Sequence, residues 1–417
     1  MSLMRIAFRN LGRARARTAL SLVAIAVGVF AVILTKGTID GIFDMMIGNS
    51  IRFTSGHVRI VAREYPLKER LLSLNYPVDG FQGEGYESVV NAFKEIPLVS
   101  QVVPRLRFGT MVVGRGEELE GLMGMGVEPQ AEDRLIGLSR YLVKGRLLRS
   151  GKREAIMGQR TLDRLGLEVG DRFTLIFNTA LGSLKGYTFV VVGSVKSGLP
   201  YLDDGLVFVP LDVAQAMLDM GPAVTEVLVM AKDEARVPDL LRDVEGVLKA
   251  RGADARYVAK PWYEHSEMMR MSQVAKTAYN FVYFFILFLA GFVVINTMLM
   301  IVNERRREIG MLGALGLRPG QIRRLFLLEG GVMGVMGSAI GASLGAIALK
   351  TLARVGIPIP GMSSLDKVFM ISSTFYPRFS SDVIAFAFVA GIAVTLVAVS
   401  WPSARAARIE PAQALRT

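Results

Sequence analysis

The chain has 417 residues, of which 51% are hydrophobic, with no cysteine and a formal net charge of +12. Without cysteine it can form neither a disulfide bond nor a thiolate-bound metal site. A strongly basic balance can indicate nucleic-acid binding, but here the basic residues gather beside long apolar segments. We therefore expect no nucleic acid among the partners.

Four apolar segments, nearly free of charge, are long enough to cross a membrane. The first has 18 residues and would reach about 27 Å as an α-helix, close to a hydrocarbon core of about 30 Å. More than 230 residues of ordinary soluble composition separate it from the second. The segments are Thr18–Thr35, Thr277–Val302, about Leu325–Leu349 and Val383–Trp401.

The sequence therefore predicts a membrane protein with four transmembrane α-helices and a large α+β extracytoplasmic domain between helices 1 and 2. The expected order is a cytoplasmic helix (1–17), helix 1 (18–36), the external domain (37–275, with a β-rich insert at about 110–205), helix 2 (276–302), a cytoplasmic coupling helix (303–324), helix 3 (325–353), a short external loop (354–381), helix 4 (382–401) and a cytoplasmic tail (402–417).

Arginine residues predict the orientation. The segment before helix 1, the connection between helices 2 and 3, and the tail together carry 14 basic and three acidic residues. By the positive-inside rule these segments are cytoplasmic, so the large domain and the 354–381 loop lie outside. Because the first apolar segment is long and no small-residue cleavage site precedes Lys36, we expect a retained anchor rather than a signal peptide.

The external domain alternates between strand and helix patterns. In Ile51–Arg63, polar Arg52, Thr54 and Arg59 alternate with apolar neighbours, as in a half-buried strand. Further strands are expected at Gln101–Val113, Arg172–Asn178, Gly186–Val195, Leu206–Pro210 and Glu226–Ala231, helices at Glu87–Ile96, Gln159–Leu165, Asp212–Met220 and Pro238–Ala250, and turns at Gly166–Asp171 and Gly198–Gly205.

No motif in the sequence carries catalytic chemistry. There is no P-loop for ATP and no nucleophilic serine elbow. The two histidines, His57 and His265, show no metal-ligand spacing, and we expect a structural role for the first and a solvated position for the second. We therefore expect neither an enzyme nor a metal or cofactor in this chain.

The third apolar segment contains one acidic residue, Glu329, about one turn from its cytoplasmic end. A carboxylate at the centre of a bilayer costs on the order of 3 kcal/mol, so we expect Glu329 to pair with Arg323 or Arg324 at the interface. Small residues three or four positions apart predict a close-packing face on this helix. They are Gly330, Gly331, Gly334, Gly337, Gly341 and Gly345.

The loop after the second segment has a distinctive sequence, NERRREIGMLGALGL, over Asn303–Leu317, followed by RPGQIRRLFLLE. Ile309, Leu312 and Leu315 would share one side of a short helix that lies on the membrane surface or enters a groove of a partner. This loop resembles the signature of the FtsX-like permeases of ABC transporters, the type VII or MacB-like group. The C-terminal WPSARAARIEPAQALR and the N-terminal AFRNLGRARARTALSL are also similar to that family.

The resemblance implies a coupling helix that docks into a separate ATPase subunit. The matching positions are Arg305, Glu308, Ile309, Gly310, Ala314 and Gly316. It implies that ATP and Mg²⁺ are bound by that partner, and that movement passes through the coupling helix to the long first and second helices, which lever the external domains. It also implies a bacterial inner-membrane location and a second permease, giving a homodimer or a heterodimer.

Within the family, Ser55–Ile60 (SGHVRI) is similar to the strand after helix 1 in the lipoprotein-releasing LolC/LolE branch. That branch implies a LolD-like ATPase, a lipoprotein cargo and a periplasmic carrier, besides membrane lipids. A lining for acyl chains is expected from apolar residues of helices 1 and 2, although the same residues could simply face lipid. The residues are Val27, Phe30, Ile33, Phe284, Phe285 and Phe288.

A loop for docking the carrier is expected around Phe177–Gly186, at Asn178, Leu181 and Leu184. Two other readings stay open. One is a MacB-like exporter of periplasmic cargo, since the motifs KGRLL, EAIMG and LGLEVGD of the external domain are shared with that group. The other is an FtsX-like signalling scaffold that controls cell-wall hydrolases, which the large external domain argues against.

Overall fold

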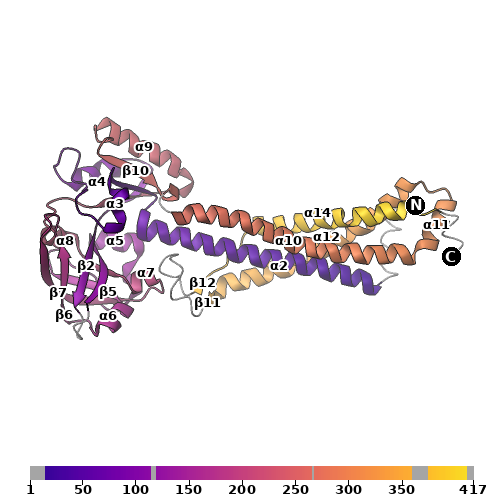
Figure 1. Cartoon of the computed structure of the whole chain (residues 1–417), viewed down its shortest axis with the longest axis horizontal. Helices are drawn as coiled ribbons and strands as arrows, with labels where there is room; N and C mark the ends of the chain where they lie inside the picture. Colours follow the sequence, from indigo (N-terminus) through magenta and orange to yellow (C-terminus); the bar gives the residue numbers. More distant parts are fainter. Residues whose placement is uncertain (1–14, 114–118, 265–266, 359–373, 411–417) are drawn as a thin grey trace. The chain divides into compact units, whose positions relative to one another are not determined.

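The structure is a computed structural model that describes residues 15–113, 119–264, 267–358 and 374–410 (Figure 1). The chain divides into two compact units. The first consists of residues 1–44, 272–357 and 375–417, and the second of residues 45–271 and 358–374. We describe each unit by itself. The predicted cytoplasmic helix at 1–17 falls almost wholly outside the described residues, as do His265 and the last seven residues of the tail.

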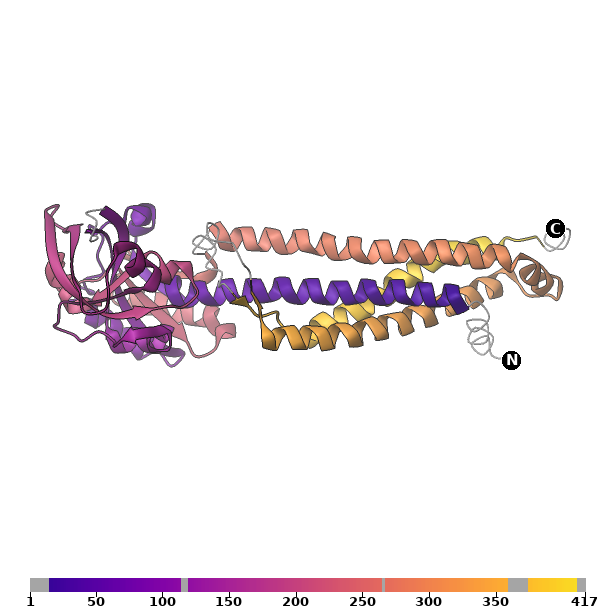
Figure 2. The same cartoon turned by 90° about the horizontal axis from the view of Figure 1, so that it is seen from below.

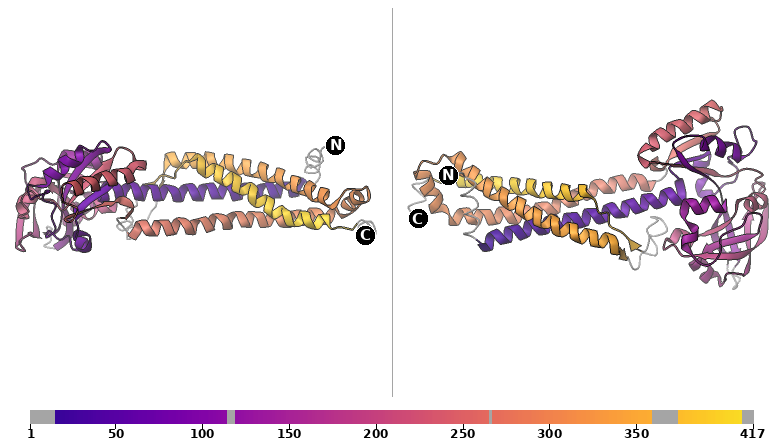
Figure 3. Two further views of the ribbon diagram at one scale, coloured as in Figure 1. Left: turned by 90° about the horizontal axis from the view of Figure 1, so that it is seen from above. Right: turned by 180° about the vertical axis from the view of Figure 1, so that it is seen from behind.

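The first unit is built from long helices that lie lengthwise against one another (Figures 2 and 3). Each contains a segment long and apolar enough to cross a membrane. This confirms the predicted membrane protein with four transmembrane helices. The four long helices are α2 (Arg15–Ser50), α10 (Glu267–Glu304), α12 (Pro319–Val355) and α14 (Ser381–Ala407), and the short α11 (Arg306–Ala314) follows α10. The last six residues of α2 and the first five of α10 belong to the second unit.

The glycines of α12 allow close helix packing, as their spacing predicts. A Cβ at Gly330 would lie 2.5 Å from a methyl group of Val399 on α14, and one at Gly337 would lie 2.8 Å from Cβ of Ile25 on α2. A Cβ at Gly341 would overlap the backbone of α2. Because apolar side chains gain nothing by leaving lipid for one another, close van der Waals contact of this kind is what holds membrane helices together.

The described residues of the second unit form a mixed ten-stranded sheet in the order β10-β1-β9-β2-β3-β8-β5-β7-β4, with β6 paired to β2 and β7. Most neighbours are antiparallel, but β3 and β8 are parallel, as are β5 and β7. The strands are β1 (Val58–Ala62), β2 (Val99–Val113), β3 (Leu119–Val127), β4 (Leu142–Gly145), β5 (Glu154–Gly158), β6 (Arg172–Asn178), β7 (Leu184–Val195), β8 (Leu206–Pro210), β9 (Glu226–Ala231) and β10 (Tyr257–Pro261).

Helices cover both faces of this sheet, which confirms the predicted α+β domain. Residues of α4 (Tyr86–Lys94), α8 (Leu211–Met217) and α9 (Val237–Ala250) join the largest apolar core. A smaller core contains side chains of α5 (Pro129–Ile136), α7 (Pro200–Asp203) and the π-turn η1 (Ile51–Ser55). The remaining helical elements are α3 (Tyr65–Lys68), α6 (Gln159–Leu165) and the 3₁₀ turns η2 (Glu69–Leu71), η3 (Leu138–Tyr141), η4 (Glu234–Arg236) and η5 (Trp262–Glu264).

The first strand of the domain is shorter than the alternating sequence predicts. Residues 51–55 continue the helix from α2 as η1, and β1 begins at Val58. The helix ends at Gly56, which has φ of +61° and donates its backbone N–H to the carbonyl of Ile51. A positive φ is easily reached by glycine and stops a helix, so the true boundary is this glycine. The predicted turn Gly198–Gly205 likewise contains α7.

Candidate functional site

The coupling segment forms α11, which follows α10 after a single residue. Arg305 lies between the two helices, and its guanidinium pairs with Glu308 at 2.9 Å and with Glu329 of α12 at 3.4 Å. This gives the intramembrane carboxylate Glu329 a partner, Arg305, that the sequence analysis does not foresee. Through these two ion pairs, Arg305 at the end of α10 holds the beginning of α11 against α12.

The predicted coupling residues fall on two sides of α11. Ile309 and Gly310 are buried in the helix unit, whereas Ala314 and Gly316 are exposed. Leu315 is 80% exposed, so it does not share a face with Ile309, contrary to the expectation from spacing. Exposed Met311 and Leu315, with Arg306 and Arg307 also exposed, give this end of the unit an apolar surface next to positive charge.

The predicted acyl lining is divided by the structure. Phe284, Phe285 and Phe288 of α10 are exposed, the first of them by 63%, and Val27 of α2 is exposed too. Phe30 of α2 is half-buried. Ile33 is fully buried, because the absence of a side chain at Gly345 lets it pack closely against α12. An exposed aromatic face therefore runs along α10, and Ile33 lies inside the helix unit rather than on that face.

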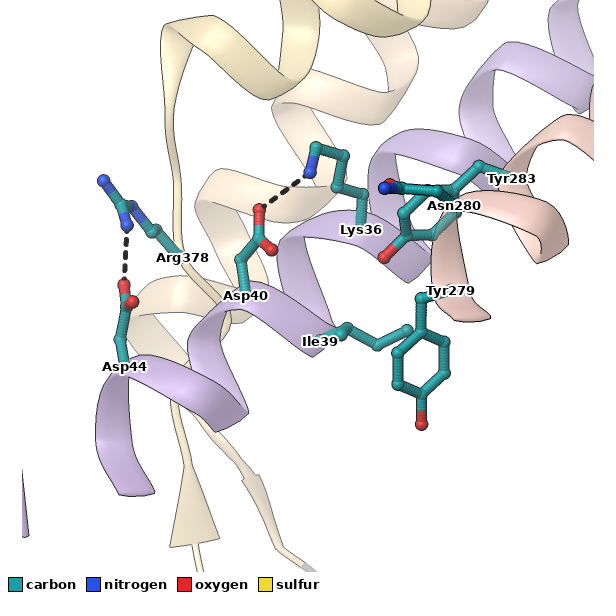
Figure 4. A pocket seen from close by; sticks show the side chains of 8 residues that line it. All are labelled: Lys36, Ile39, Asp40, Asp44, Tyr279, Asn280, Tyr283 and Arg378. Carbon is teal, nitrogen blue, oxygen red and sulfur yellow. Dashed lines mark hydrogen bonds and ion pairs between the residues drawn. The ribbon is translucent and has the colours of Figure 1, made fainter. Parts of the chain in front are cut away.

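A polar pocket of about 340 Å³ lies between α2, α10 and the segment before α14 (Figure 4). Its charged groups are paired: the Lys36 ammonium lies 3.3 Å from Asp40, and the Arg378 guanidinium lies 2.9 Å from Asp44. Lys36 also lies over the ring of Tyr283, 5.5 Å from its centre. The pocket is lined by Lys36, Ile39, Asp40, Asp44, Tyr279, Asn280, Tyr283 and Arg378.

Sequence reasoning missed this pocket. Lys36, Asp40 and Asp44 recur every four residues, a spacing that places side chains on one side of a helix and could have indicated a charged face. Tyr279 and Arg378, in contrast, are more than 230 residues away in sequence from this part of α2, and only packing brings them near. Among the described residues, no cluster of histidine and acidic side chains could hold a metal ion.

The predicted carrier-docking residues lie at the end of the β6–β7 hairpin. Asn178, Leu181 and Leu184 are all exposed, Leu181 by 80%. The hairpin is anchored near its tip, because Lys185 pairs with Asp219 at 2.7 Å. Two exposed leucines on an anchored hairpin form a defined apolar projection of the second unit.

His57, for which the sequence predicts a structural role, precedes β1, and its Nδ1 accepts a hydrogen bond from the backbone N–H of Ala231 at 3.0 Å. Burial lowers the pKa of His57 below the usual 6.5, because the charged imidazolium is kept from water. These contacts indicate a structural role within the sheet.

Comparison with known proteins bears on the whole chain. The profile of the MacB-like periplasmic core domain matches residues 18–247, and that of the FtsX-like permease C-terminal region matches residues 280–411. The chain is 24% identical to the lipoprotein-releasing system transmembrane protein LolC of Xylella fastidiosa over 408 residues, covering 95% of this chain and 92% of that protein. It is also 24% identical to LolE of Haemophilus influenzae over 411 residues, with coverages of 95% and 93%.

Other similarities cover less of the chain or are weaker. The macrolide export ATP-binding/permease protein MacB of Rhodospirillum rubrum is 26% identical over 237 residues, 56% of this chain and 34% of that protein. Among solved structures, the periplasmic region of MacB from Actinobacillus actinomycetemcomitans covers 55% of this chain and 95% of its own, with 14% identity and a TM-score of 0.36. The extracellular domain of YknZ covers 42% and 88%, with 17% identity and a TM-score of 0.34.

The apolar helices and these matches define a membrane permease with a large extracytoplasmic domain. The curated relatives named above are transmembrane proteins of the lipoprotein-releasing system and a macrolide export ATP-binding/permease protein. The chain belongs to the FtsX/MacB-like family of ABC transporter permeases, and within it is of the LolC/LolE type.

Proposed function

We propose that this permease releases lipoproteins from the bacterial inner membrane and passes them to a periplasmic carrier, using ATP hydrolysed by a separate ATPase subunit. A lipoprotein is an amphiphile, with acyl chains attached to a polar polypeptide. A site for it needs an apolar surface at the depth of the chains and polar groups where the polypeptide begins.

The observation that carries this proposal is the continuity between the pocket and the aromatic face of α10. Asn280 lines the pocket and is followed directly by exposed Phe281, and Phe284, Phe285 and Phe288 continue over the next two turns. Acyl chains could lie along these rings inside the bilayer, where close van der Waals contact, rather than removal from water, would favour their binding. Lys36 and Asp44 would meet the first polar residues of the cargo.

The conformational change of the ATPase would be transmitted to the permease through α11. The sequence holds no P-loop, so ATP and Mg²⁺ would bind to a LolD-like partner, against which the exposed Met311 and Leu315 would pack. Arg305 would transmit the movement, because its ion pairs connect α11 to the neighbouring helices. The full coupling set stays a prediction, with Glu308, Ile309, Gly310, Ala314 and Gly316 as its other members.

The lengths of α2 and α10 suit a lever. They have 36 and 38 residues, or about 54 and 57 Å as straight helices, against a hydrocarbon core of about 30 Å. Each therefore continues well beyond the bilayer. With the arginine-rich flanks in the cytoplasm, this excess would belong to the external side, where the carrier would meet the hairpin at Leu181 and Leu184.

A MacB-like exporter is the second candidate, because the external domain matches the MacB-like profile. It would use the same coupling to an ATPase but would have no need for an acyl-chain site. An FtsX-like scaffold that controls cell-wall hydrolases is the third. Neither of these two functions requires a charged pocket at the end of an aromatic helix face.

Mass spectrometry of the tagged permease, purified in mild detergent with its genomic neighbours co-expressed, tests the proposal. We expect an ABC ATPase, acylated lipoproteins and either a second permease or a second copy of this chain. An ATPase accompanied by a cell-wall hydrolase or an outer-membrane channel, without lipoproteins, would instead support the signalling or export function.

A further inference from the structure

The sheet of the second unit carries buried charge on one face. Arg105 and Arg107 of β2 point to the face opposite Leu106, because successive side chains of a strand alternate, and Leu106 lies in the large apolar core. Arg59 of β1 and Glu226 of β9 are also buried. Arg59 and Arg105 are each only 1% exposed. Charges at this depth persist only where they are paired and hydrogen-bonded.

Arg59, Arg107 and Glu226 pair with one another and with Glu69 of η2. Arg59 lies 2.5 Å from Glu226 and 2.8 Å from Glu69, and Arg107 lies 3.1 Å from Glu69 and 3.6 Å from Glu226. Burial by itself would lower the pKa of Arg107, but the nearby carboxylates, Glu226 foremost, raise the pKa above its usual value. Arg107 therefore stays charged, and the four side chains together connect the turn η2 to β1, β2 and β9.

Arg105 makes a different set of contacts. Its guanidinium donates two bonds to the fully buried Glu132 of α5, from Nε at 3.1 Å and from Nη2 at 2.6 Å. It also donates to two backbone carbonyls of η1, that of Phe53 at 2.8 Å and that of Arg52 at 3.1 Å. One side chain of the sheet therefore holds both α5 and the π-turn.

The π-turn is the end of the first membrane helix. α2 passes without a break into η1, and the combined helix ends at Gly56. The last four carbonyls of a helix have no partner within it, and the helix dipole makes this end negative, so a cation that donates to these carbonyls is well placed. Arg105 is such a cap, contributed by another element of the fold. π-turns are rare and frequently occur at functional positions.

We infer that Arg105, held by Glu132, is the joint through which a movement of α2 is passed to the sheet of the external domain. This inference rests on the proposed function for the source of that movement. A buried ion pair adds little stability over apolar side chains of similar volume, but its directional bonds fix the relative orientation of the elements it joins. Apolar contacts alone would let the helix end slide or turn. Arg105 is thus a positioning residue.

The test uses the full-length permease in complex with its ATPase. Arg105→Lys keeps the charge but replaces the planar guanidinium by one ammonium group, which cannot serve a carboxylate and two carbonyls in the same geometry. Glu132→Gln keeps the volume and leaves Arg105 able to reach η1, so it is the milder variant. Arg146→Lys is the matched control, because Arg146 makes a bidentate pair with Glu154, at 2.7 and 2.6 Å, and neither side chain is hydrogen-bonded to η1.

Two readouts separate a joint from a merely structural pair. The first is amide hydrogen exchange of residues 45–56, which we expect to accelerate about tenfold or more in Arg105→Lys, because charge-assisted hydrogen bonds to the helix end are lost. The second is the change in exchange over the strands of the sheet when nucleotide is trapped in the ATPase. We expect that change in the natural protein and in Arg146→Lys, and its loss in Arg105→Lys, while ATP hydrolysis continues.

An unaltered nucleotide response in Arg105→Lys, despite faster exchange at residues 45–56, would overturn the inference and leave the cluster a structural one. Unchanged exchange at residues 45–56 in both Arg105→Lys and Glu132→Gln would overturn it as well. The nucleotide response needs no cargo. A natural protein that shows the response but releases no lipoprotein would therefore refute the proposed function and leave the joint standing.

Discussion

The packing of α12 on α2 gives a quantitative prediction at Gly341. A Cβ added there would overlap the carbonyl oxygen of Ala26 and lie 3.0 Å from its Cα. Backbone atoms cannot rotate away, so the two helices would have to separate. Alanine is favoured over glycine within a helix by about 0.5–1 kcal/mol, but overpacking costs about 1–3 kcal/mol. We therefore expect Gly341→Ala to lower the free energy of unfolding by about 1–2 kcal/mol.

Gly331→Ala on the same helix is the matched control. Its added Cβ would make an ordinary contact with Leu396, at 3.5 Å, so this variant should keep the propensity gain of about 0.5–1 kcal/mol. The assay is unfolding of both purified full-length variants in mild detergent by titration with a denaturing detergent, followed by circular dichroism. The expected difference of about 2 kcal/mol corresponds to roughly 30-fold in the unfolding equilibrium. Equal stability of Gly341→Ala and Gly331→Ala would refute the close approach of these helices.

The remaining predictions concern coupling, cargo, carrier and pH. Glu308→Gln removes one ion pair of Arg305 and should lower the amount of ATPase that co-purifies with the permease, while the external domain stays folded. Full ATPase association and activity in this variant would contradict the placement of the coupling helix. Phe288→Gln should reduce the co-purified lipoprotein about tenfold, and an unchanged amount would remove this ring from the cargo site. Leu181→Asp should abolish cross-linking to the carrier without lowering the thermal unfolding midpoint, and retained cross-linking would exclude the hairpin. His57 binds a proton less readily folded than unfolded, so stability should fall as the pH drops below 6.5, and His57→Asn should flatten that fall; the same fall in both proteins would show that other groups cause it.

Much of the fold could be predicted because its signals are local. Apolar length identified the membrane helices, and alternation placed Arg172–Asn178, Leu206–Pro210 and Glu226–Ala231 with the bounds of β6, β8 and β9. The same alternation was misleading at residues 51–55. There the alternation of polar Arg52 and Thr54 with apolar residues is typical of a strand, but the helix continues to Gly56, which ends it.

The functional contacts were harder to predict because they join distant parts of the chain. Arg105 alternates with apolar neighbours as a surface residue of a strand would, and nothing local indicates that it is buried with Glu132 on a helix 27 positions away. The pairing of Glu329 with Arg305 was missed for a similar reason. Arg323 and Arg324 are nearer in sequence, but the bend between α10 and α11 brings Arg305 to it.

The most direct test of lipoprotein release is a reconstituted assay. The permease and its ATPase are placed in proteoliposomes with a lipoprotein, and transfer of that protein to a soluble carrier is measured with and without ATP. We predict ATP-dependent transfer of the acylated protein and no transfer of the same protein without its acyl chains. ATP hydrolysis without transfer, or equal transfer of both forms, would contradict this prediction.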